Sequence, residues 1–312
     1  MAKRRKLSEL TAEETATVVD FLKRFQDELD EEDEDGQEVV AALGKVVNKL
    51  KEVKHVPFSD ATILSLTKAN IKVDLLELSS LKEGEARKLG DKTTVPDALT
   101  LEETKKNIVY TRKYVSFETE AGCRILINVL LIHAASNLST SSIGAAIAPE
   151  FRIPETPLES GGSAYGGAVD YLMVLGEPWA RNLVLQSPKL AFTNKDILRC
   201  MTCNIYEAKP DNVLKALPQV VMAAVVQSQR FRFQTFRGCV TTGEEWLFFV
   251  YSKDVHGSGG TVSWLPSIRL ERDLSGLPLV LGLLCDWIEN GQKKQMRFCT
   301  YAGPSGETGN DD

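Results

Sequence analysis

The chain has 312 residues and a net charge of −6, with 43% hydrophobic and 26% charged residues. This composition is that of an ordinary globular protein, with enough material for one large domain or two smaller ones. No uncharged apolar run of about 18 residues occurs, and the basic start lacks the apolar stretch of a secretory signal, so we expect an intracellular protein that does not span a membrane.

The negative charge is concentrated at the two ends of the chain. Residues 1–35 contain 6 Lys/Arg and 12 Asp/Glu, so this segment alone carries the whole net charge. Without the acidic residues Glu307, Asp311 and Asp312 the remaining body has a charge of +3. A surface that binds phosphate is therefore compatible with the composition of the body.

Residues 1–36 are expected to form a charged, disordered N-terminus. The basic cluster Lys3-Arg4-Arg5-Lys6 suits nuclear import, although a solvated chain end has the same composition. A capping box at Thr11–Glu14 predicts a short helix, which ends in the acidic run Asp27–Asp35. Such runs are usually solvated, and mimicry of nucleic acid or contact with histones is the alternative.

Residues 37–98 are expected to form a helical N-terminal region. Gln37–Val53 has one apolar stripe at helical spacing, and Val56–Leu89 is interpreted as one or two further helices. The polar stretch Gly90–Asp97 predicts a linker. No chemical motif occurs here, which indicates a packing or partner-binding module.

Residues 99–302 are expected to form the main domain. A capping box at Thr100–Glu103 starts a short helix, and Phe117–Asn137 is predicted to be a longer, mostly apolar helix buried between layers. Glu118 and Glu120 lie near the start of that helix, where either carboxylate would complement the helix dipole.

Two carboxylates follow on predicted strands. Ser139–Gly167 is rich in small residues and predicts a loop, after which Ala168–Val174 is a strand that contains Asp170. Asn182–Phe192 is predicted to be another strand, and Asp196–Tyr206 is a strand that runs into Glu207.

A helix is predicted from Val213 to Gln229, and it contains Gln219. The segment Arg230–Arg237 then alternates basic and aromatic residues, a pattern suited to a nucleic-acid backbone. The rest of the chain predicts a hairpin, one further strand, an apolar helix, a last strand and a disordered acidic tail: Phe236–Thr241 and Glu245–Ser252, Thr261–Glu271, Leu274–Asn290, Gln292–Tyr301, and 303–312.

Glu207 and Lys209 are the pair of residues with the clearest chemistry. They are two positions apart at the end of a strand, so their side chains share one face. A carboxylate beside an ammonium can hold a divalent metal and steer a water next to it. The same Glu-x-Lys pattern at Glu52–Lys54 and Glu103–Lys105 lies in predicted helices, where the two side chains would not share a strand face.

The chain resembles the PD-(D/E)XK nuclease superfamily in its triad Asp170, Glu207 and Lys209. The predicted elements around this triad also follow the superfamily's order of helix, strand, strand, helix and strand. The resemblance is greatest to the nuclease-like domains of fungal and oomycete crinkler-type proteins. The resemblance covers Phe117–Lys253. It implies an α/β, restriction-endonuclease-like fold with an αβββαβ core, a mixed central sheet flanked by helices. Two features depart from the pattern: no proline precedes Asp170, and its separation of 37 residues from Glu207 implies an inserted hairpin or loop around Pro178–Asp196.

The resemblance also implies a site. Asp170, Glu207 and the Ala208 carbonyl would bind Mg²⁺ or Mn²⁺, and Lys209 would position the attacking water. The first core helix would add a carboxylate, with Glu120 the better match and Glu118 the alternative. Gln219 would support the site or touch the phosphate backbone, unless it simply faces solvent.

We therefore expect a metal-dependent nuclease that acts on nucleic acid, DNA rather than RNA. The alternative is a catalytically inactive protein on the same scaffold that binds nucleic acid or a protein partner. The sequence indicates neither the substrate in detail nor the oligomeric state.

Overall fold

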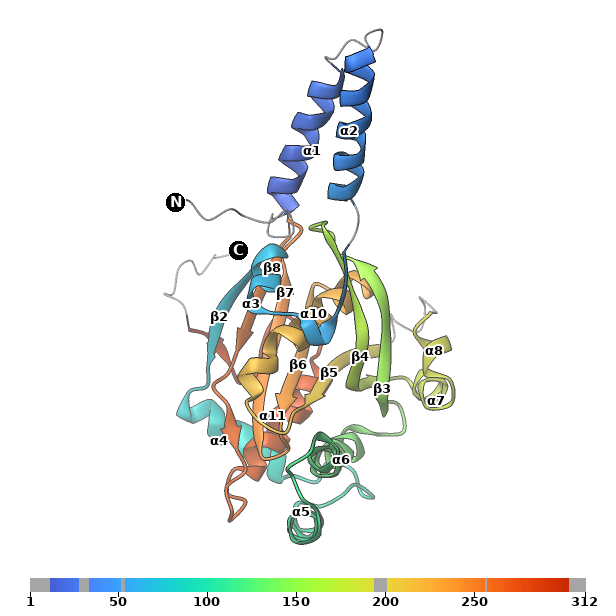
Figure 1. Ribbon diagram of the computed structural model, residues 1–312. Coiled ribbons are helices and arrows are strands. Elements are labelled where there is room, and N and C mark those ends of the chain that lie inside the picture. The colour runs from blue at the N-terminus through green and yellow to red at the C-terminus, as the bar shows by residue number, and fades with distance from the viewer. Residues whose placement is uncertain (1–11, 28–33, 52–53, 194–200, 256, 303–312) are drawn as a thin grey trace, which may run out of the picture.

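The computed structural model describes residues 12–27, 34–51, 54–193, 201–255 and 257–302. A mixed sheet of ten strands runs through the molecule, and helices cover both of its faces (Figure 1). The prediction of an α/β fold with a mixed central sheet flanked by helices is confirmed.

Eight strands follow one another across the sheet in the order β1-β4-β5-β6-β7-β8-β2-β10, while β3 pairs with β4 and β9 pairs with β7. Neighbours are parallel in the pairs β1/β4, β5/β6 and β2/β8 and antiparallel elsewhere. The strands are β1 (Lys54–Pro57), β2 (Ile71–Glu77), β3 (Gly144–Pro157), β4 (Ser163–Gly176), β5 (Met201–Ala208), β6 (Thr235–Thr241), β7 (Glu245–Lys253), β8 (Gly260–Trp264), β9 (Ile268–Arg269) and β10 (Thr300–Tyr301).

Two hydrophobic cores lie on the two faces of the sheet, because side chains alternate along each strand. The first core is formed with a short 3₁₀ turn and four helices: η2 (Phe58–Asp60), α3 (Ile63–Lys68), α7 (Pro178–Gln186), α8 (Pro188–Ala191) and α10 (Val213–Phe231). The second core is formed with α4 (Ser80–Asp91), α5 (Leu101–Tyr114), α6 (Glu120–Leu138) and α11 (Leu277–Glu289).

Several helices begin where the sequence predicts. The capping box of α5 is present, with the Thr100 side chain accepting from the Glu103 backbone and the Glu103 side chain accepting from the Thr100 backbone. Asn212 caps α10 in a left-handed conformation, and its side chain accepts from the Lys215 N–H. The predicted hairpin is also confirmed as β6 and β7.

Strand β4 has different partners along its second edge. One edge pairs with β3, while the other pairs with β1 at residues 163–166 and with β5 at residues 171–176. Residues 167–170 lie between these two partners. Asp170 is therefore the last of the four residues between the two paired stretches, at the point where β1 and β5 separate.

The hairpin of β3 and β4 bends at the same point. Ala148 and Phe151 belong to the same core although they are three residues apart, and so do Val169 and Leu172 on the partner strand. A regular strand would place residues two apart on one face. Glu150, with φ of 48°, lies within this bend, so the backbone conformation rather than simple alternation sets the direction of the side chains here.

The range Val56–Leu89, predicted to form one or two helices, has the helices α3 and α4 but also two strands that were not predicted. It contains β1, η2, α3 and β2 before α4, and both strands join the central sheet. In β2 the buried residues are Ile71 and Leu76, a spacing that does not reveal a strand. The sheet thus crosses the boundary predicted at residue 98.

Two further predictions around Asp170 are wrong. The stretch predicted to be a loop, Ser139–Gly167, forms β3 and the start of β4, and β3 tolerates its prolines because it is an edge strand. The stretch predicted to be a strand, Asn182–Phe192, belongs to α7 and α8, each of which begins with a proline at its first helical position. The segment inserted between β4 and β5 therefore contains helices rather than a hairpin.

Smaller differences occur at the two ends. Helices α1 (Ala12–Asp27) and α2 (Glu34–Lys51) form a hairpin that projects from the body (Figure 1), so the described part of residues 1–36 is helical rather than disordered. The predicted last strand is reduced to β10, and the strand predicted over Thr261–Glu271 is split into β8 and β9. The basic cluster at residues 3–6, residues 28–33 of the acidic run and the tail 303–312 lie outside the described residues.

Helix α6 is long and apolar enough to cross a membrane by length and composition alone. Nine of its residues are buried, and it packs against α5, α11 and the sheet. These contacts are those of a core helix, as predicted for this segment.

Candidate active site

Asp170 and Glu207 lie opposite each other on neighbouring strands. Tyr171 pairs with Tyr206 in the antiparallel register of β4 and β5, and the two carboxylates occupy the next position beyond that pair. Directly opposed residues project to the same side of a sheet. Both side chains are buried, and the backbone N–H of Ala208 donates a hydrogen bond of 2.6 Å to Asp170 Oδ2.

Lys209 and Gln219 meet the same carboxylate. Lys209 follows the last residue of β5, and its Nζ lies 2.9 Å from Glu207 Oε1. Gln219, on the second turn of α10, donates to the same oxygen at 2.5 Å. Gln219 therefore does not simply face solvent, and Oε1 of Glu207 has two donors.

The start of α6 supplies a third carboxylate. Thr119 caps this helix by accepting from the Gly122 N–H, and Glu120 is the first helical residue. Glu120 Oε2 lies 3.7 Å from Lys209 Nζ. Glu118 precedes the helix and is exposed, so the structure brings Glu120 rather than Glu118 to the Asp170, Glu207 and Lys209 cluster.

Arg124 is a member of the cluster that the sequence did not assign. Its guanidinium Nη2 contacts both Asp170 Oδ1 and Glu120 Oε1, the latter at 2.7 Å, and its Nη1 lies 3.0 Å from Glu150. A lone cation four residues after Glu120, in a helix otherwise so apolar, is the signal that could have found it. Arg124 thus bridges α6 to both strands of the bent hairpin.

Burial governs the ionisation of the two central carboxyls. Burial raises the pKa of Glu207 to about 7, with a further contribution from the negative charge of Asp170. Burial also raises the pKa of Asp170, although the Ala208 N–H and Arg124 act in the opposite direction. For Lys209 burial alone would lower the pKa, but the contact with Glu207 outweighs it, and the net shift is upward.

The donor atoms of this cluster fit a hard divalent cation. Glu207 Oε2 is a buried oxygen without a hydrogen-bond partner, which is costly unless something positive reaches it. Carboxylate and carbonyl oxygens are the ligands that Mg²⁺ and Mn²⁺ prefer. Within the described residues, no three His, Cys, Asp or Glu side chains are close enough together to form a complete metal-binding group. In this structure Arg124 contacts Asp170 and Lys209 contacts Glu207.

Glu207→Gln should remove a pH dependence of stability. In the unfolded chain the carboxyl titrates near its ordinary value of 4.5, so between that pH and about 7 the folded protein binds the additional proton. Relative to the variant, wild-type stability should therefore fall as pH rises through this window, by on the order of 3 kcal/mol. The measurement is the difference in free energy of unfolding by urea between wild type and variant, compared at pH 5 and pH 8 in chelator, since His133 and Asp170 titrate in both proteins.

The matched control for this experiment is Glu118→Gln, which changes an exposed carboxylate that precedes the same site. It should follow the wild-type pH profile. An identical pH profile for wild type and Glu207→Gln would show that Glu207 is not the group that titrates.

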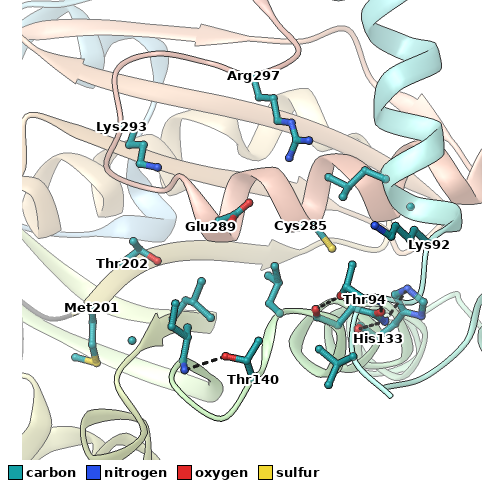
Figure 2. A pocket seen from close by; sticks show the side chains of 18 of the residues that line it. Lys92, Thr94, His133, Thr140, Met201, Thr202, Cys285, Glu289, Lys293 and Arg297 are labelled. Carbon is teal, nitrogen blue, oxygen red and sulfur yellow. Dashed lines mark hydrogen bonds between the residues drawn. The ribbon is translucent and has the colours of Figure 1, made fainter. Parts of the chain in front are cut away.

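A cavity of about 720 Å³ lies elsewhere, and Figure 2 shows Lys293 and Arg297 on one side of it and Met201 and His133 on the other. The last turns of α4, α6 and α11 line it, and helix C-termini carry partial negative charge. The basic side chains around it are of the charge that complements these helix ends. We call Asp170, Glu207, Glu120 and Lys209 the carboxylate cluster, and none of these residues lines the cavity.

The basic and aromatic segment Arg230–Arg237 does not form one exposed basic face. Arg237 is completely buried and pairs with Asp286 at 3.1 Å, while Phe236 belongs to the first core. Only the first part of the segment, with Arg230 and Arg232, reaches the surface. The predicted division into a core face and a basic face therefore holds for Arg230 and Arg232, but Arg237 is not part of the basic face.

The five side chains predicted from the sequence thus meet in one site, and Arg124 joins them there. The five are Asp170, Glu207, Lys209, Glu120 and Gln219. No protein-family model and no curated protein matches this chain, so the site must be interpreted from its own geometry.

Proposed function

We propose that the protein is a metal-dependent nuclease with a restriction-endonuclease-like core. The order α6, β3, β4, β5, α10, β6 has the αβββαβ pattern of that superfamily, with α7 and α8 inserted between β4 and β5. Asp170 lies on the second of these strands, and Glu207 lies near the end of the third. This correspondence supports the resemblance that the sequence motif suggested.

The observation that carries the proposal is the convergence of five residues from four elements. Asp170 and Glu207 lie next to the paired residues Tyr171 and Tyr206 of β4 and β5. Lys209 and Gln219 both contact Glu207 Oε1, and Glu120 approaches Lys209 from α6. Glu207 also keeps a buried oxygen, Oε2, that no protein donor reaches and that could serve as a metal ligand.

Asp170, Glu207 and the Ala208 carbonyl are the groups that would hold Mg²⁺ or Mn²⁺. When bound, such an ion stabilises negative charge on the phosphoryl oxygens and lowers the pKa of a water. The raised pKa of Lys209 keeps its side chain an ammonium at neutral pH, so it acts as a hydrogen-bond donor that orients water and phosphate oxygens. Gln219 fixes Glu207 through Oε1 and leaves Oε2 free.

The first test is the metal dependence of the purified protein. We expect cleavage of labelled DNA with Mg²⁺ or Mn²⁺ and none with chelator, and we expect either ion to raise the unfolding temperature, because a ligand that binds only the folded state stabilises it. Asp170→Asn should lose both effects. Single- and double-stranded DNA and RNA are compared to identify the substrate.

Equal cleavage by wild type and Asp170→Asn would mean that the activity comes from a contaminant or another site. A shift in unfolding temperature that is also the same in both proteins would place the ion elsewhere.

The alternative is a catalytically inactive protein on this scaffold that binds nucleic acid or a protein partner. The contact of Arg124 with Asp170 and Glu120 favours it, because the guanidinium already supplies the positive charge that a metal ion would bring. Binding of nucleic acid without cleavage, and without any effect of divalent ions on unfolding, would select this function.

A further inference from the structure

A second cavity, of about 660 Å³, lies where β1, β3 and β4 meet α8 and the end of α10. Three basic side chains line it from three different elements: Arg152 from β3, Lys189 from α8 and Arg230 from α10. We call these three residues and the space between them the basic cleft. Its floor is apolar and includes Phe151 and Phe192.

Among the described residues, no carboxylate pairs with the cations of the basic cleft. In the part of the chain that the structure describes, no ion pair is formed by Arg152, Lys189 or Arg230. The one carboxylate in the lining, Glu155, has its own partner, since His55 Nδ1 lies 2.9 Å from it. The cleft therefore has a positive excess that suits an anionic ligand.

Arg230 is the most informative of the three cations. Its side chain is only partly exposed, and burial lowers its pKa. Its hydrogen-bond partner is a neutral oxygen, Gln227 Oε1, at 2.9 Å. An arginine in the last turn of a helix can complement the dipole. That explanation does not extend to Arg152, because it lies on a strand, β3, and faces the same space.

The basic cleft and the carboxylate cluster are linked by the bent hairpin. Glu150, which contacts Arg124, is two residues from Arg152 on β3. On β4, Gly167 in the lining precedes Asp170 by three residues, a distance of roughly 10 Å along a strand.

We propose that the basic cleft binds backbone phosphates of the substrate strand, to one side of the bond that is cut. The position relative to the cut rests on the proposed nuclease function, whereas the binding of phosphates follows from the charge of the cleft. The cleft thus holds the strand and the carboxylate cluster acts on it.

The test compares two double variants that lose equal charge. Arg152→Gln/Lys189→Gln changes two exposed cations of the cleft, and Lys72→Gln/Arg272→Gln changes two exposed cations on β2 and before α11. Binding of a fluorescent 20-nucleotide DNA or RNA is measured in chelator at several salt concentrations, and unfolding curves confirm that both variants are folded.

We expect the cleft variant to bind at least about 10-fold more weakly at low salt. The slope of log K against log salt should fall by roughly 1.4 for single-stranded DNA, about 0.7 for each lost phosphate contact. The control variant should stay within about 2-fold of wild type. With Mg²⁺ present, the cleft variant should show a raised KM and an unchanged kcat, because the cleft lies away from the reacting atoms.

The possible outcomes separate this inference from the proposed function. Equal effects of the two double variants, or no binding by the wild type, would overturn the inference even if cleavage is observed. Binding that depends on the cleft, in a wild-type protein that cleaves nothing, would support the phosphate site and reject the nuclease.

Discussion

Lys209→Ala is expected to lower metal-dependent cleavage by at least about 100-fold, the effect of removing one well-placed donor from a transition state. Its ammonium lies 2.9 Å from Glu207 and 3.7 Å from Glu120, at the side of the site that is open to solvent. No other ammonium in the described residues contacts these carboxylates. The measurement is the initial rate of cleavage of labelled DNA at saturating Mg²⁺.

The matched control is Lys215→Ala, which removes an exposed lysine from the first turn of α10. It should keep the wild-type rate. Unfolding of the Lys209 variant should be measured in parallel, because loss of the ion pair to Glu207 would show there. Full activity in Lys209→Ala would remove this residue from the mechanism.

Arg237→Met should destabilise the fold by about 3–5 kcal/mol, which is the usual cost of removing one partner from a buried ion pair. Arg237 and Asp286 are both completely buried, 3.1 Å apart. Arg237 Nη2 also donates to the carbonyls of Lys293 and Gln295, so it attaches the segment after α11 to the sheet. The free energy of unfolding in urea provides the measurement.

The double variant Arg237→Met/Asp286→Leu separates burial of a charge from loss of packing. Replacing both partners of a buried pair by apolar side chains is often neutral, so the double variant should recover most of the lost stability. Equal destabilisation of the single and double variants would indicate that packing on Trp287, whose ring lies 5.0 Å from the guanidinium, matters more than the charge.

The elements that the sequence predicts correctly have strong local signals. Helices α5 and α10 begin at side chains that cap them, and the turn at Thr242-Gly243 identifies the β6/β7 hairpin. In β3 the local signals are misleading, since prolines suggest a loop while the edge position tolerates them. In β2 the strand depends on pairing with β8 and β10, which are both distant in sequence.

The candidate site was predicted for a similar reason. Glu207 and Lys209 are recognisable because their spacing fits the end of a strand, and Asp170 because it is charged within a hydrophobic run. The role of Arg124 depends on tertiary contact with Asp170 and with Glu150. The bend that presents Asp170 depends on a left-handed residue in β3, which sequence periodicity does not report.

The pairing of β2 with β8 also constrains how the chain acquires its structure during synthesis. Ile71 and its partner Gly260 are about 190 residues apart. At 5–20 residues per second, the ribosome needs roughly 10–40 s to produce the second strand after the first. Strand β2 must remain unpaired through most of translation, and an exposed strand edge is prone to pair with other chains. A chaperone that covers β2 during this interval would therefore protect the nascent chain from such pairing.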